Sequence, residues 1–102
     1  MEVTKTAAEY RLFALSHSVP PKPGLARVPA TENGSSVAVE LWDIPVCNFG
    51  SFTAEVPPPL GIGSITLLDG RIVKGFICEP YALTDARDIT SFGGWRAYLE
   101  SL

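Results

Sequence analysis

Apolar and polar positions alternate most regularly on either side of Asp69-Gly70, in the C-terminal half of the chain. Residues 61–68 and 71–78 show the two-residue period of β-strands. An Asp-Gly pair between two such segments is typical of a tight turn, so this region is predicted to form a β-hairpin. Within the second arm, one face carries Ile72, Lys74, Phe76 and Cys78.

Three further strands are predicted upstream of this hairpin. Residues 10–15 (YRLFAL) are apolar and aromatic, as in a strand, and three prolines make residues 16–24 a loop. Residues 25–29 are expected to form a short strand. Residues 36–44 alternate, so that one face of this strand enters the core with Val37, Val39 and Leu41.

Two short helices are also predicted. Pro45 suits the first turn of a helix over residues 46–54, and three consecutive prolines at 57–59 prevent its continuation. Near the C-terminus, an apolar stripe with helical spacing consists of Ile89, Phe92, Trp95 and Leu99. Gly93 and Gly94 in this stripe each cost about 1 kcal/mol relative to alanine, which is tolerable where a close backbone approach requires small residues.

The length of 102 residues corresponds to one domain, and 46% hydrophobic with 19% charged residues indicates a folded chain. Residues 1–9 are polar and lack a period, so they are expected to be a flexible lead-in to a single domain over residues 10–102. The order of elements predicts an α+β fold. We expect a small mixed or antiparallel, partly closed β-barrel whose openings are covered by short helices.

The formal net charge is −3 and the cations are scattered, which argues against a nucleic-acid partner. Cys47 and Cys78 form no CxxC pair and lie in apolar surroundings, so both are expected to be free, buried thiols. With one histidine in the chain, no metal site and no cofactor are expected. No apolar stretch approaches the ~18 residues of a membrane span, and the N-terminus lacks a secretory pattern, so a cytoplasmic location is expected.

Three features are candidates for chemistry, and each also has a purely structural explanation. Gly61 and Gly63 leave backbone amides uncovered, which suits either the start of a strand or a loop that lines a pocket. Lys74 needs a carboxylate partner such as Glu40, or an anionic ligand, if its face is buried; otherwise it is an edge lysine whose ammonium stays in water. His17 titrates near neutral pH, so it is either an acid–base group or an ordinary loop residue in solvent.

Several motifs together resemble a known family. The segments YRLFAL, PPKPGL, VELWDIP, PLGIG, VKGF and DITSFGGWRAYL, in this order, are similar to the C-terminal domain of allophanate hydrolases, enzymes of urea catabolism. The resemblance implies a fold like that of γ-glutamyl cyclotransferases. In the family, an amidase portion with a Ser-Ser-Lys arrangement releases ammonia from allophanate, and the C-terminal portion is implicated in decarboxylating N-carboxycarbamate and in assembling the dimer. The chain has no GGSSGG-like serine loop, so it resembles the C-terminal portion alone.

The resemblance also implies where a substrate would bind. The positions that line the family's pocket correspond to Tyr10, Pro59, Leu60, Gly61, Ile62, Gly63, Gly75 and Phe76. These residues are expected to hold a small dicarboxylate-like substrate through backbone amides and a cation. Decarboxylation of a carbamate requires only that the nitrogen be protonated as carbon dioxide leaves, and His17 and Lys74 are the expected catalytic donors.

One motif of the family is not found in this sequence. A strand and loop of the type HLxGxPLN normally precede the YRLFAL strand, and their absence is expected to expose a sheet edge that favours a homo-oligomer or an amidase partner. Three functions therefore stay open. The chain is a decarboxylating enzyme of allophanate breakdown, a non-catalytic assembly or dimerisation module for a separate amidase, or a γ-glutamyl cyclotransferase-like enzyme with Glu55 near the acid–base position.

Overall fold

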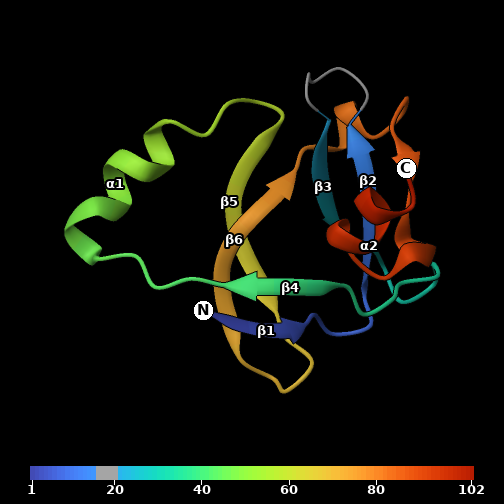
Figure 1. Ribbon diagram of the computed structural model, residues 1–102, viewed down its shortest axis with the longest axis horizontal. Coiled ribbons are helices and arrows are strands. Elements are labelled where there is room, and N and C mark those ends of the chain that lie inside the picture. The colour runs from blue at the N-terminus through green and yellow to red at the C-terminus, as the bar shows by residue number, and fades with distance from the viewer. Residues whose placement is uncertain (16–20) are drawn as a thin grey trace.

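The computed structural model describes residues 1–15 and 21–102 (Figure 1). The described residues form seven strands, β1 (Glu2–Lys5), β2 (Tyr10–Leu15), β3 (Lys22–Arg27), β4 (Ala38–Leu41), β5 (Leu60–Thr66), β6 (Ile72–Cys78) and β7 (Arg87–Asp88). The helices among them are α1 (Val46–Ala54), α2 (Trp95–Glu100) and the short 3-10 helices η1 (Pro80–Ala82) and η2 (Thr90–Phe92). The predicted α+β class is confirmed.

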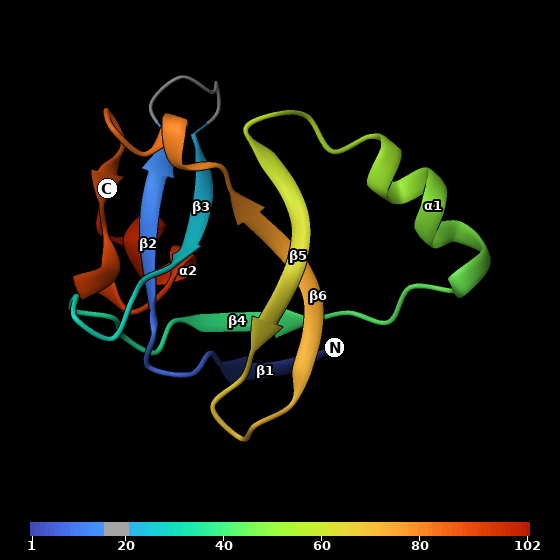
Figure 2. The same ribbon diagram turned by 180° about the vertical axis from the view of Figure 1, so that it is seen from behind.

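The described strands pair antiparallel in three separate sheets: β1 with β4, β2 between β3 and β7, and β5 with β6. The expected partly closed barrel is therefore wrong. β1 and β4 run across the lower end of the β5–β6 hairpin instead of extending its ladder (Figures 1 and 2). Isolated backbone bridges join residues next to the strands, such as Thr6 opposite Leu67 and Tyr10 opposite Ser35, without merging the three sheets into one.

Strand β2 lies at the centre of the three-stranded sheet, as its apolar sequence predicts. Tyr10, Leu12 and Ala14 are buried, and they belong to one core with Ile65 and Ile89. β2 pairs with β3 along its whole length and with β7 at Phe13 and Ala14. On the side of β2 away from β3, β7 pairs with it, and Ile89 N–H donates to Leu12 C=O at 2.8 Å.

The first residues of the chain are ordered, which corrects the expectation of a flexible lead-in. Glu2–Lys5 forms β1, which pairs with β4 in the register Val3 opposite Glu40. Val3 is 70% exposed, so this strand shows no apolar period that a sequence pattern could reveal. Backbone pairing, together with a 2.5 Å ion pair between Glu2 and Arg71, holds it in place.

A loop was predicted over residues 16–24 and a short strand over residues 25–29, but the strand begins earlier, at Lys22. Pro23 lies within β3, an outer strand of its sheet, where a missing N–H is tolerated. The hairpin around Asp69-Gly70 is confirmed. Its turn is closed by Leu67 N–H, which donates to Arg71 C=O at 2.8 Å. Gly70 has a φ of 96°, a conformation that favours glycine in a three-residue hairpin loop.

Helix α1 has the predicted bounds but not a buried face. None of its residues is buried, and it projects away from the sheets (Figures 1 and 2). Its one described aromatic contact is between Phe52 and Phe76 of β6, with ring centroids 5.7 Å apart. The local sequence pattern therefore predicted the helix correctly, but the helix does not pack into the core.

The C-terminal apolar stripe does not form one continuous helix. Gly93, at φ 85°, ends η2, and α2 begins at Trp95. A Cβ built on Gly94 would lie 2.9 Å from the Cβ of Ala38, and Ala38 N–H donates to Gly93 C=O at 2.8 Å. The two glycines therefore serve the predicted close backbone approach, here to β4.

Candidate functional site

A cavity of about 410 Å³ lies where the proline-rich segment before β5 meets the ends of β2 and β3. Its lining consists of Leu15, Lys22, Pro57, Pro58, Pro59, Leu60, Tyr81, Ala82 and Asp85. The volume is within the range of small-molecule sites. Pro59 and Leu60 of the predicted PLGIG site are among its lining residues.

The proline wall of this cavity is held at both ends by backbone hydrogen bonds. Leu60 N–H donates to Pro57 C=O at 3.1 Å, and Glu79 N–H donates to Pro59 C=O at 2.9 Å. Proline rings fix φ, so this wall loses little further entropy when a ligand binds. Two residues of η1, Tyr81 and Ala82, also line the cavity, and Ala82 N–H donates to Glu79 C=O at 3.2 Å.

The polar groups of the cavity are a cation, a carboxylate and a phenol. Lys22 is exposed at the start of β3, and Asp85 and Tyr81 belong to the segment after β6. A lysine ammonium beside apolar prolines suits a small carboxylate, since charge-assisted hydrogen bonds strengthen where water is partly excluded. A phenol hydroxyl can donate a second hydrogen bond.

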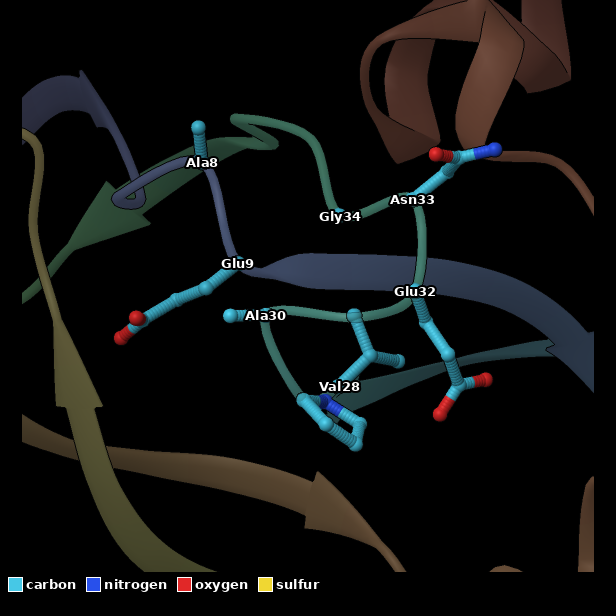
Figure 3. A pocket seen from close by; sticks show the side chains of 8 residues that line it. Ala8, Glu9, Val28, Ala30, Glu32, Asn33 and Gly34 are labelled. Carbon is cyan, nitrogen blue, oxygen red and sulfur yellow. The ribbon is translucent and has the colours of Figure 1, made fainter.

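A second cavity, of about 340 Å³, differs in charge. Glu9, Glu32 and Asn33 line it, and their side chains point in different directions (Figure 3). Glu9 pairs with Arg27 at 3.4 Å. Two carboxylates and no cation line this cavity, whereas the proline-lined cavity has Lys22 beside its one carboxylate, Asp85. The proline-lined cavity is therefore the better candidate site for an anion.

The predicted PLGIG residues do not act as one group. Pro59 and Leu60 line the cavity, whereas Gly61, Ile62 and Gly63 continue along β5. A Cβ on Gly63 would lie 2.6 Å from Ile77 Cδ1, but a Cβ on Gly61 would meet nothing within 4 Å. Gly63 therefore serves core packing, which is the structural explanation for it.

Gly75 has the same role on the facing strand. It lies opposite Gly63 in the ladder, and its Cβ would lie 2.6 Å from Ile65 Cδ1. The two glycines thus make room for Ile65 and Ile77 on the inner face of the hairpin. Phe76, the neighbour of Gly75, is 44% exposed on the outer face.

Lys74 lies on the outer face of β6 and is exposed, as expected for an edge lysine. Its Nζ donates to Ser64 Oγ at 2.8 Å across the hairpin. The proposed partner Glu40 instead pairs with Arg96 at 2.5 Å. Lys74 is not among the residues that line the proline-lined cavity.

Tyr10 is buried, with 1% of its surface exposed, and its hydroxyl is engaged in the fold. The hydroxyl accepts hydrogen bonds from Thr66 N–H, at 2.9 Å, and from the Arg27 guanidinium. This places Tyr10 in the core instead of in a pocket. His17 lies outside the described residues.

Lys22, Tyr81 and Asp85 were missed by sequence reasoning. Lys22 lies in a segment read as a proline loop, and no motif connects it with residues about 60 positions downstream. The prediction that both cysteines are buried holds for Cys78 alone, because Cys47 is exposed on α1. Among the described residues, no three His, Cys, Asp or Glu side chains form a group that could hold a metal ion.

The family model of the allophanate hydrolase C-terminal domain matches residues 1–100. The chain belongs to this family. It is 48% identical over 102 residues to the urea amidolyase of Saccharomyces cerevisiae and 46% identical over 101 residues to that of Lachancea kluyveri. These alignments cover 97% and 96% of this chain but 6% of each relative, so the chain spans a small part of their length.

Solved structures of other proteins show the same fold. The allophanate hydrolase of Kluyveromyces lactis is 44% identical with a TM-score of 0.92, over 99% of this chain and 17% of that chain. The K. lactis urea amidolyase gives the same identity and TM-score over 99% of this chain and 6% of that one. A third structure, c4763, a uropathogenic E. coli-specific protein, is 34% identical with a TM-score of 0.86 and is covered over 76% of its length.

No helix in the described part of this chain is long and apolar enough to cross a membrane.

Proposed function

We propose that this allophanate hydrolase C-terminal domain acts in urea and allophanate breakdown by holding N-carboxycarbamate in the proline-lined cavity. The observation that carries this proposal is the position of Lys22 beside Pro59 and Leu60 in a cavity of about 410 Å³. The family membership supports the pathway, and the cation beside a rigid wall supports a carboxylate ligand.

Decarboxylation of N-carboxycarbamate requires few groups from the protein. The bond between nitrogen and one carboxylate carbon breaks, carbon dioxide leaves, and its electron pair stays on the nitrogen. The nitrogen then takes a proton, which converts N-carboxycarbamate into carbamate. A cation that binds the second carboxylate orients the substrate, and one donor near the nitrogen supplies the proton.

The proposed donors are His17 and Lys74, with Lys22 as the binding cation. Lys74 lies on the outer face of β6 and would act only on a substrate that reaches that face. The remaining proposed contacts are backbone groups of the segment from Pro59 to Gly63, of which Pro59 and Leu60 line the cavity. We place the protein in the cytoplasm, where its substrate would be produced.

The test uses the amidase portion of an allophanate hydrolase to generate N-carboxycarbamate continuously, with carbon dioxide and ammonia measured separately. Lys22→Ala is expected to slow carbon dioxide release by about tenfold or more, since a hydrogen bond to a charged group is lost. Lys5→Ala is the matched control, because Lys5 is exposed on β1, away from the cavity lining. His17→Ala and Lys74→Ala test the two donors in the same assay.

Equal rates for Lys22→Ala and Lys5→Ala would remove the cavity as the binding site. Unchanged release by both His17→Ala and Lys74→Ala would remove the assigned donors. If the chain leaves carbon dioxide release unaffected at every concentration, the decarboxylating function is excluded.

A second function, assembly with a separate amidase, is favoured by one observation. In the urea amidolyases this domain accounts for 6% of the chain, so it works there next to much larger parts. Co-purification with an amidase, and a change in that amidase's ammonia yield, would support assembly without turnover. For the cyclotransferase alternative, Glu55 is exposed at the end of α1 and does not line the proline-lined cavity.

A further inference from the structure

The proline-lined cavity holds a carboxylate as well as a cation, although the proposed ligand is an anion. Lys22 and Asp85 both line it. A carboxylate beside an anionic ligand lowers the affinity, because like charges repel more strongly where water is partly excluded. This loss is offset when the ligand also donates a hydrogen bond to that carboxylate. The pair of charges therefore points to a ligand in which an anionic group and a donor lie close together.

The strand register places these two residues on opposite sides of the end of β2. On one side, Leu15 of β2 pairs with Lys22 of β3. On the other side, Ala14 pairs with Arg87 of β7, and Asp85 lies just before β7 in the chain. Neighbouring strands are about 4.8 Å apart, so the two backbones flank β2 at a separation of roughly 10 Å. Leu15 lies between them and is itself part of the cavity lining.

Consecutive turns fix the backbone of the segment that carries Asp85. Leu83 N–H donates to Pro80 C=O at 3.0 Å, and Ala86 N–H, directly after Asp85, donates to Leu83 C=O at 3.2 Å. In Figures 1 and 2 this segment, between β6 and β7, lies beside the end of β2. The fold therefore sets the position of the Asp85 backbone before a ligand binds, which reduces the entropy lost on binding.

Lys22 supplies the cation of this pair. It is exposed at the start of β3, and within residues 1–15 and 21–102 its ammonium forms no ion pair, either with Asp85 or with another carboxylate. A ligand carboxylate can therefore bind Lys22 without displacing a salt bridge of the described residues. The cation and the carboxylate then act on two different parts of one small ligand.

We propose that Asp85 determines the specificity of this cavity by accepting a hydrogen bond from the N–H that joins the two carboxylate groups of N-carboxycarbamate. This inference rests on the proposed function and names the feature of the substrate that is recognised. Lys22 binds one carboxylate, and the Asp85 carboxylate accepts from the central nitrogen. An analogue with CH2 in place of the N–H has no donor there, so Asp85 faces an anion without compensation. A site built around a substrate N–H rejects such an analogue.

Allophanate and malonamate are matched probes of this contact, because they carry the same charge and differ only in N–H against CH2. Isothermal titration calorimetry of the full chain measures the affinity for each probe and requires no turnover. Allophanate is expected to bind about tenfold or more tightly than malonamate, since malonamate lacks one hydrogen bond to a charged group.

Asp85→Ala is expected to abolish this preference. Allophanate should bind about tenfold more weakly because its acceptor is lost, and malonamate should bind more tightly because the repelling charge is gone. Asp85→Asn keeps the size and an acceptor oxygen without the charge, so it is expected to narrow the preference even where the alanine variant does not fold. Asp43→Ala is the control, because Asp43 is exposed and does not line the cavity.

Equal affinities of the parent for the two probes, or an undiminished preference in Asp85→Asn, would overturn the role of Asp85. If Asp85 served only the fold, its variants would weaken both probes equally, which also contradicts the proposal. Carbon dioxide release is scored separately. A preference for allophanate without carbon dioxide release would contradict decarboxylation alone, whereas equal binding with normal release would contradict the role of Asp85 alone. A parent that binds neither probe would remove the cavity as the site, and this proposal with it.

Discussion

The backbone N–H of Thr66 donates a hydrogen bond of 2.9 Å to the hydroxyl of Tyr10, which joins the outer edge of β5 to β2. Tyr10 is 1% exposed and belongs to the central core. The Tyr10 hydroxyl thus links the β2 sheet to the β5–β6 sheet, although no continuous ladder joins these two sheets. The contact explains why this tyrosine, expected in a pocket, is part of the frame.

Tyr10→Phe is expected to destabilise the fold by about 1–2 kcal/mol, since it leaves Thr66 N–H and the Arg27 guanidinium without this acceptor. Urea unfolding monitored by circular dichroism measures the loss. Tyr81→Phe is the control, because Tyr81 is 64% exposed and its hydroxyl can bond to water. Equal stabilities of the two variants would show that the Tyr10 hydroxyl contributes nothing.

Gly63→Ala is expected to cost about 1–3 kcal/mol, as overpacking in a core does. A Cβ at this position would lie 2.6 Å from Ile77 Cδ1, so the isoleucine must move. Gly61→Ala, two residues earlier on the same strand, places its Cβ in open space and is expected to be tolerated. Thermal unfolding of the two variants compares them directly, and similar melting temperatures would contradict the packing role of Gly63.

The stability contributed by Asp88 is expected to depend on pH. Burial works to raise the pKa of this carboxyl, but hydrogen bonds from Thr90 and the Arg11 guanidinium outweigh it and lower the pKa below its ordinary value. A lowered pKa in the folded state stabilises the fold above the unfolded-state pKa. That contribution is lost as the pH falls through the folded-state value.

Asp88→Asn is therefore expected to destabilise by roughly 1 kcal/mol at pH 7, a value reduced by the partial exposure of the ion pair. The difference from the parent should shrink below about pH 4. Unfolding curves at pH 7 and pH 3 provide the measurement, with Asp43→Asn as an exposed loop control. A difference that is constant between the two pH values would rule out the charge of Asp88 as its cause.

The two cysteines are expected to react at different rates with a thiol reagent. Cys47 is exposed on α1, whereas Cys78 is buried, and its pKa is raised by burial and by the neighbouring Glu79. A raised pKa lowers the thiolate fraction at pH 8 and therefore the rate of attack. Counting fast-reacting thiols in the folded chain should give one, and Cys47→Ser should abolish the fast phase. Two fast thiols in the parent would place Cys78 in contact with solvent.

Local patterns were sufficient wherever neighbouring residues decide the structure. Asp69-Gly70 indicated the hairpin because its left-handed turn residue is a glycine next to the chain reversal. Pro45 and the prolines at 57–59 bounded α1 for the same reason, since proline acts on the backbone at its own position. The segment 10–15 was recognisable because a strand with neighbours on both sides is apolar nearly throughout.

The pairing of distant segments escaped these patterns. Val3 of β1 is 70% exposed, so β1 is a strand because its backbone pairs with β4 and not because its side chains are buried. The alternation along β6 distinguished its two faces but did not show which one is buried. Ile77 packs over Gly63 and Ile65 over Gly75, so that face is the inner one and the face with Lys74 is the outer one.

By itself, the sequence determined the α+β class, the hairpin, the bounds of α1 and the family motifs, because those depend on residues close together in the chain. The tertiary structure alone decided that the sheets stay separate and that Lys22 lines one cavity with Pro59 and Leu60. These features depend on which distant backbones meet, and that is settled by the burial of one shared core and not by any local period.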